Sequence, residues 1–209
     1  MENDAIKLTD AARYYSLRPH QTEAWDWLEL QLPRKILNEF AKKYRDDPRP
    51  AVDPSVISNP STGKVSETGK NLIKYYEGLE LEAYLCSSGI PTIGYGSTEN
   101  VEMGMKITQE KAESLLDQDL AKFEDAIERL ITVPLSQSQF DALTSWAFNV
   151  GTGAVQDSTL RRRLNEGEDV MEVIRQELPR WNKGPNGPLP GLIKRRKAEV
   201  KLAETGRFG

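Results

Sequence analysis

Residues 76–97 read YEGLELEAYLCSSGIPTIGYGS, and this stretch joins two kinds of local structure. Gly78 follows a segment whose apolar residues have helical spacing, so we expect a helix to end there. The residues after it are rich in Tyr, Leu, Ile and Thr, with Ser87-Ser88-Gly89 as a turn. Pro91 and the glycines that follow it favour short strands over a large sheet. The stretch therefore predicts a helix followed by a small β region.

Helix signals lie on both sides of this stretch. Upstream, Ser66 can cap the helix that runs to Gly78. Downstream, apolar residues recur every three or four positions from Thr108 to Ile131. Ser136-Gln137-Ser138-Gln139 has the form of a capping box, and Gly151 is expected to end the helix that it opens. The predicted fold class is α+β, a mainly helical lobe with a small β-hairpin region.

Three more helix boundaries are readable toward the C-terminus. Ser158 can cap a basic helix, and Asp169 starts another helix in capping-box form. Pro190 suits the first turn of the last helix, which Gly206 is expected to end.

The chain divides at a proline-rich stretch. Residues 48–65 contain four prolines among Ser, Asp and Gly, a composition typical of a linker. Residues 1–47 before it carry apolar residues near helical spacing, and we expect a short helical N-terminal unit of unknown role. Because a unit of this size buries little apolar area by itself, we expect it to pack on the second domain, on a partner or on another copy of the chain. Residues 66–209 form the larger, catalytic domain.

Composition excludes several kinds of chemistry. Cys86 is the only cysteine and His20 the only histidine, so intramolecular disulfides and multi-His zinc sites are ruled out. Hydrolytic chemistry must use carboxylates, hydroxyls or the one thiol, and no metal or cofactor is implied. The formal net charge of −4 gives no support to nucleic acid as a partner. Neither a signal peptide nor a membrane-spanning segment is recognisable, so no stable membrane insertion is expected.

A basic run, Lys194-Arg195-Arg196-Lys197, stands against this acidic background. It has two interpretations from sequence alone: a solvated helix face, or a patch that attracts a polyanion such as cell wall.

Residues 76–97 also contain the pattern Glu77-x8-Cys86-x5-Thr92, with Thr92 opening Thr-Ile-Gly-Tyr-Gly. With the blocks that follow, the chain resembles the phage-type lysozymes, the family of T-even and lambdoid phage muramidases, over about residues 66–209. The resemblance implies a lysozyme-like fold and hydrolysis of the peptidoglycan β-1,4 bond between N-acetylmuramic acid and N-acetylglucosamine. The further blocks are Ala147–Ala154, Ser158–Arg161, Leu164–Gly167, Trp181-Asn182, and Leu189–Leu192 followed by Arg195-Arg196.

The resemblance implies that Glu77, Cys86 and Thr92 are the catalytic residues. Glycoside hydrolysis needs an acid that protonates the leaving oxygen and a second group on the opposite ring face. Partial burial of Glu77 among apolar neighbours would favour its protonated form. The alternative, a surface glutamate at a helix end, is less favourable because its charge opposes the helix dipole.

Cys86 stands where aspartate is more common in the family. A thiol is a weaker base than aspartate unless its pKa is lowered, and a potent nucleophile when ionised. Since the family implies inversion by direct attack of water, our hypothesis is that Cys86 and Thr92 together position that water. Action as the base, action as a nucleophile, and a small apolar residue filling the hairpin stay open for this thiol.

Family position also predicts substrate-binding residues. Thr98, Phe148 and Thr159 would border the sugar groove, with core packing as the alternative for Phe148. Ser97 replaces the histidine that many relatives have after Gly-Tyr-Gly, and we expect a supporting contact to be lost there.

Other functions remain compatible with these residues. A lytic transglycosylase keeps the glutamate and needs no water-positioning partner, and a non-catalytic module would only bind peptidoglycan. The biological role is open between a free endolysin, which leaves the host cytoplasm through a holin lesion to reach the cell wall and periplasm, and a virion-borne component with residues 1–65 as a tether.

Overall fold

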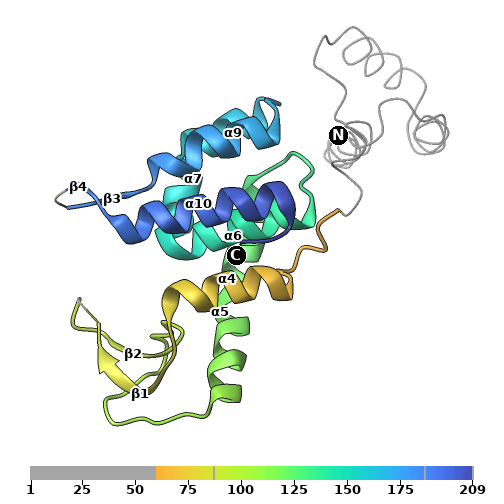
Figure 1. The fold of residues 1–209 in the computed structure, drawn as a ribbon. Coiled ribbons are helices and arrows are strands. Elements are labelled where there is room, and N and C mark those ends of the chain that lie inside the picture. The colour runs from red at the N-terminus through yellow and green to blue at the C-terminus, as the bar shows by residue number, and fades with distance from the viewer. Residues whose placement is uncertain (1–59, 87, 186, 209) are drawn as a thin grey trace, which may run out of the picture.

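The computed structural model describes residues 60–209 except residues 87, 186 and 209. The expected N-terminal unit, residues 1–47, lies outside the described residues, as does the linker up to residue 59. The described part is a helical lobe with a small hairpin at one end (Figure 1). In chain order its elements are α4 (Glu67–Glu77), β1 (Glu80–Leu85), β2 (Pro91–Gly94), α5 (Gln109–Leu130), α6 (Gln137–Val150), α7 (Thr152–Asp157), α8 (Thr159–Asn165), α9 (Val170–Glu177), the 3-10 helix η2 (Leu178–Arg180), β3 (Lys183–Gly184), β4 (Gly187–Pro188) and α10 (Pro190–Thr205).

Helix α6 forms the centre of the lobe and contacts α4, α5 and α10 (Figure 1). Its residues Phe140, Leu143 and Trp146 are buried. Each such side chain contributes about 1.5–3 kcal/mol when fully buried. The predicted capping box of Ser136 and Gln139 is present, so the sequence fixes where this central helix begins.

The other predicted helix boundaries are also confirmed. Side-chain oxygens of Ser66, Ser158 and Asp169 accept backbone N–H groups at the starts of α4, α8 and α9. Pro190 lies in the first turn of α10, and Gly206 ends that helix in a left-handed conformation. These signals are local, which explains why they are readable from the sequence.

Three short elements were not predicted: α7, η2 and the β3–β4 pair. Helix α7 starts at Gly151 without a side-chain cap. The strands β3 and β4 have two residues each, too few to show an alternating pattern. These elements were missed because they carry no periodic signal.

The predicted small β region is a two-stranded antiparallel hairpin. Tyr84 of β1 pairs with Thr92 of β2, and the register is irregular between Glu80 and Tyr84. Strand β2 contacts helix α5, and α4 leads directly from the helical lobe into β1 (Figure 1). Glu77 thus lies where the lobe passes into the hairpin.

Residues 60–65, the last part of the expected linker, lie against the helical lobe. The backbone N–H of Ser61 donates to the carbonyl of Leu135 at 3.1 Å. Val65 is buried, and its backbone N–H donates to Glu124 Oε1 at 2.8 Å. The chain is therefore anchored to the lobe before α4 begins.

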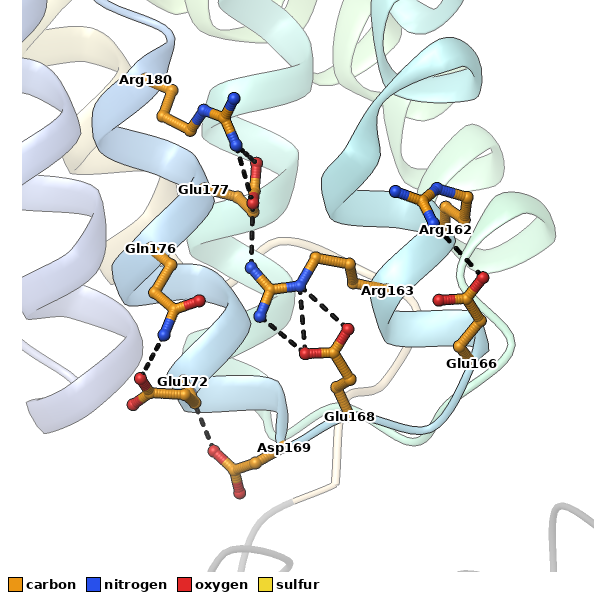
Figure 2. A network of polar contacts seen from close by, with 9 residues as sticks. All are labelled: Arg162, Arg163, Glu166, Glu168, Asp169, Glu172, Gln176, Glu177 and Arg180. Atoms are coloured by element: carbon orange, nitrogen blue, oxygen red, sulfur yellow. Dashed lines mark hydrogen bonds and ion pairs between the residues drawn. The ribbon is translucent and has the colours of Figure 1, made fainter.

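An ionic network joins α8 to α9 (Figure 2). Arg163 donates from Nη1 to Glu177 Oε1 at 2.9 Å and from Nε to both carboxylate oxygens of Glu168 at 2.9 and 3.0 Å. Arg180 Nη1 also donates to Glu177, at 3.1 Å. Arg163 therefore ties the end of α8 to the helix that follows it.

Candidate active site

Glu77 is the last residue of α4, and its neighbour Gly78 ends the helix. Gly78 has φ 76°, a conformation in which other residues are strained, and its N–H donates to Lys74 O at 3.1 Å. The Glu77 side chain is 24% exposed to solvent. The side chain is therefore partly covered by the protein, while the residue as a whole is exposed.

Arg195 of α10 is the direct partner of Glu77. Its Nη1 donates to Glu77 Oε1 at 2.6 Å, and its side chain is only 4% exposed. The guanidinium offsets the unfavourable placement of a carboxylate at a helix C-terminus. Sequence reasoning missed this pairing, because 118 positions separate the two residues.

The four residues of the basic run on α10 do not share one environment, so neither interpretation from the sequence applies to all of them. Arg195 and Arg196 are buried, whereas Lys194 and Lys197 are exposed. Both interpretations drawn from the sequence are wrong for the two arginines, which form ion pairs with Glu199 inside the lobe.

Cys86 lies at the end of β1, beside Thr92 of β2. The backbone amide of Ile90 lowers the pKa of the Cys86 thiol, with a smaller contribution from the backbone of Ser88. Thr92 is buried, and its Oγ1 donates to the carbonyl of Ile90 at 2.9 Å. The hairpin therefore brings thiol and hydroxyl together and favours the thiolate.

Ser97 makes a contact that was expected to be lost. It is buried, and its Oγ donates to Asp119 Oδ2 of α5 at 2.6 Å. The expectation is wrong, because a serine hydroxyl reaches this carboxylate and ties the segment after β2 to the long helix.

The predicted substrate-binding residues lie on different elements. Thr98 is exposed just after the hairpin. Phe148 is half-buried on α6 with its ring 5.0 Å from that of Phe123. Thr159 is half-buried at the start of α8. Phe148 thus packs on the core while part of it stays accessible.

A pocket of about 410 Å³ is lined in part by Asn149, whose Oδ1 accepts a hydrogen bond from Arg196 Nη2 at 3.0 Å. Leu192 precedes Arg195 by one turn of α10, and Asn149 follows Ser145 by one turn of α6. Arg195, the partner of Glu77, donates from Nη2 to Ser145 O at 3.2 Å. The pocket is therefore about one helical turn from Arg195. Its lining residues are Asn149, Val150, Arg180, Trp181, Lys183 and Leu192.

Neither a metal-binding cluster nor a membrane-spanning helix is present among the described residues. Residues 60–209, apart from the three gaps, contain no cluster of His, Cys, Asp or Glu that could hold a metal ion. None of the helices described is long and apolar enough to cross a membrane.

Comparison with known proteins identifies the family. The sequence model of the family described as phage lysozyme matches residues 74–199. An endolysin of Acyrthosiphon pisum secondary endosymbiont phage 1 is 46% identical over 145 residues, which are 68% of this chain and 98% of that protein. An endolysin of Salmonella phage P22 is 48% identical over 144 residues, which are 66% of this chain and 97% of that protein.

A solved structure agrees with this assignment. The muramidase domain of SpmX from Asticaccaulis excentricus has a TM-score of 0.63 and 39% sequence identity, and the match covers 68% of this chain and 98% of that one. The predicted lysozyme-like fold is confirmed. The chain belongs to the phage lysozyme family, and it is a glycoside hydrolase that degrades peptidoglycan, of the endolysin type.

Proposed function

We propose that Glu77 is the general acid that protonates the leaving oxygen of the β-1,4 bond between N-acetylmuramic acid and N-acetylglucosamine. The observation that carries this proposal is the geometry of its carboxyl group. Arg195 holds Oε1 at 2.6 Å, and within the described part of the chain Oε2 has no hydrogen-bond partner. One oxygen is thus fixed by the protein, and the other is left to carry the proton.

Cys86 and Thr92 position the water that attacks from the opposite ring face. The Thr92 hydroxyl donates to Ile90 O at 2.9 Å, so its lone pairs are left to accept a hydrogen bond from water. The lowered pKa of the Cys86 thiol raises the fraction of thiolate, a better acceptor than the thiol. Direct attack of this water inverts the configuration at the anomeric carbon.

The test of the acid is Glu77→Gln, assayed by turbidity clearing of permeabilised cells. Loss of the proton donor is expected to lower the initial rate by about 10²–10⁴-fold. Glu67→Gln is the matched control, because Glu67 lies in the first turn of the same helix with a side chain 79% exposed. Equal clearing by wild type and Glu77→Gln would overturn the proposal. Mass spectrometry of the products should show reducing muramic ends, since anhydro ends indicate a transglycosylase.

The test of the water-positioning pair uses a methanethiosulfonate reagent. Cys86 is the only cysteine in the chain, so the reagent has one target. Complete labelling is expected to abolish lysis by filling the space of the water. Treated Cys86→Ala, which carries no thiol, controls for reactions elsewhere. Full activity of the labelled wild type would contradict the role.

Substrate-binding is proposed for Thr98, Phe148 and Thr159, which present hydroxyls and an aromatic ring toward the sugar chain. The pocket about one helical turn from Arg195 is expected to hold a neighbouring part of the same substrate, since the amide of Asn149 and the indole of Trp181 suit a sugar. Substitution of Phe148 by Ala is expected to raise KM more than it lowers kcat.

In the cell, the protein is proposed to be made in the host cytoplasm and released through a holin lesion to the cell wall and periplasm. The endolysin names of the two relatives support this role. A virion partner held by the N-terminal unit is the alternative. Detection of the chain in purified phage particles would decide for the virion.

The domain division is proposed as residues 1–47, a linker at residues 48–65 and a catalytic domain at residues 66–209. The family match at residues 74–199 supports the last boundary. A chain lacking residues 1–59 should keep the far-UV circular dichroism of the helical lobe and its lytic activity. Loss of both would overturn the division.

A further inference from the structure

Four charged side chains form a cluster between α4 and α10. They are Glu77, Arg195, Arg196 and Glu199. Arg196 is 1% exposed and Glu199 is fully buried, whereas the Glu77 side chain keeps 24% of its exposure. The cluster therefore connects the interior of the lobe to the carboxyl group at the active site.

Glu199 is surrounded by hydrogen-bond donors. Its Oε1 accepts from Arg195 Nε at 3.3 Å, Arg196 Nη2 at 3.0 Å and Ser145 Oγ at 2.9 Å. Its Oε2 lies 2.9 Å from Arg196 Nε. Burial raises the pKa of Glu199, and the two guanidinium groups and the Ser145 hydroxyl oppose this. Oε2 accepts no hydrogen bond, and it is the charge of the two guanidinium groups beside this carboxyl group that favours its ionised form.

Arg195 is held on three sides. Its Nη1 donates to Glu77, its Nε to Glu199 and its Nη2 to the carbonyl of Ser145 at 3.2 Å. Its guanidinium carbon also lies 5.5 Å from the centre of the Tyr76 ring. Glu199 is the only one of these contacts that is both negatively charged and fully buried, so it supplies the countercharge on the inner side.

This arrangement decides how strongly Arg195 acts on Glu77. A guanidinium 2.6 Å from a carboxylate opposes protonation of that carboxylate, yet a general acid must hold a proton. A second carboxylate on the same guanidinium offsets part of its charge. We propose that Glu199 is a positioning residue for Glu77, which aims Arg195 at the carboxyl group and offsets its charge so that Glu77 can carry the catalytic proton. The inference rests on the proposed role of Glu77 as general acid.

The other groups around the cluster do not replace Glu199. Helix α6 contributes only the uncharged Ser145 and Asn149, and Asn149 Oδ1 accepts from Arg196 Nη2 at 3.0 Å. On α4, burial raises the pKa of Tyr76, so this phenol stays neutral at physiological pH. On the hairpin, Cys86 is the titratable group of the proposed site.

The test is Glu199→Gln in the full chain, with Glu177→Gln as the matched control. Glu177 is also buried and bonded to two arginines, Arg163 and Arg180, in the network between α8 and α9 (Figure 2), and neither arginine bonds to Glu77. The readout is the carboxyl ¹³C resonance of Glu77, identified by its absence in Glu77→Gln. Both variants are first checked by circular dichroism, and data are taken at a temperature at which they are folded.

In Glu199→Gln the pH at which Glu77 is half-protonated is expected to fall by about one unit relative to wild type. The kcat at neutral pH then falls about tenfold with KM unchanged. Glu177→Gln should change neither quantity. An unshifted Glu77 titration in Glu199→Gln, or an equal shift in Glu177→Gln, overturns the inference.

A second variant tests the same charge balance in the opposite direction. Arg196→Met leaves Glu199 to offset Arg195 alone, so the half-protonation pH of Glu77 should rise, and a fall would overturn the inference. Each variant is decisive by itself if the other does not fold. Wild type and Glu77→Gln are assayed in parallel. Equal activity of these two would refute Glu77 as the acid, whereas a large difference with an unshifted Glu199→Gln refutes only the role of Glu199.

Discussion

The α8–α9 network and the cluster around Arg195 use the same pairing in different surroundings. In each, an arginine lies between two glutamates: Arg163 between Glu168 and Glu177, and Arg195 between Glu77 and Glu199. The outer network includes carboxylates open to water, since the Glu168 side chain is 42% exposed. The difference in burial separates an ion pair that fastens two helices from one that contacts the proposed general acid.

The largest expected difference in stability comes from Arg196→Met. Arg196 is 1% exposed, and its loss leaves the buried Glu199 with one arginine instead of two. Breaking a buried pair in this way costs about 3–5 kcal/mol. The free energy of unfolding in urea measures the effect, and a cost no larger than that of Arg163→Met would contradict the distinction between the two networks.

Arg163→Met should cost less, about 1–2 kcal/mol, because the exposed Glu168 regains water and Glu177 keeps Arg180. The initial rate of wall lysis should equal that of wild type, since Arg163 is bonded to Glu168 and Glu177 and not to Glu77. Urea unfolding and turbidity clearing check the two parts. A lower rate at a temperature where the variant is folded would remove the distinction drawn above.

A smaller effect is expected from pH. The hydrogen bond from Arg163 lowers the pKa of Glu168, so its folded pKa lies below that of the unfolded chain. The pair therefore stabilises the fold above the ordinary glutamate pKa of about 4.3, and this stabilisation is lost as pH falls through the folded value. Melting temperatures between about pH 5 and pH 3 should fall less steeply for Glu168→Gln than for wild type. Parallel curves would exclude the linkage.

The smallest change is expected for Arg162→Gln. Arg162 lies 3.5 Å from Glu166, and both side chains are more than half exposed. An exposed pair of this kind contributes about 0.5 kcal/mol or less. The melting temperature of this variant serves as the baseline for Arg163→Met, and a comparable loss in both would mean that Arg163 has no special place on α8.

The helix boundaries were predictable because each depends on a few adjacent residues, such as Ser136 with Gln139. The arginine cluster was not predictable, because its contacts join residues that lie far apart in the sequence. Four consecutive basic residues on a helix point in four directions about 100° apart, so some must face the lobe. The sequence does not say which, because Arg195 pairs with a residue 118 positions away. The family pattern indicated Glu77, Cys86 and Thr92, and it included Arg195 in its C-terminal block without assigning that residue to Glu77.

The anchoring of residues 60–65 has a mechanical consequence. This segment joins the lobe at Leu135 and Glu124, while the eleven residues of α4, about 16 Å long, separate it from the hairpin (Figure 1). A pull on the chain ahead of residue 60 would load the contacts with α5 and the start of α6 first. The strands that carry Cys86 and Thr92 would bear none of that force until those contacts had broken.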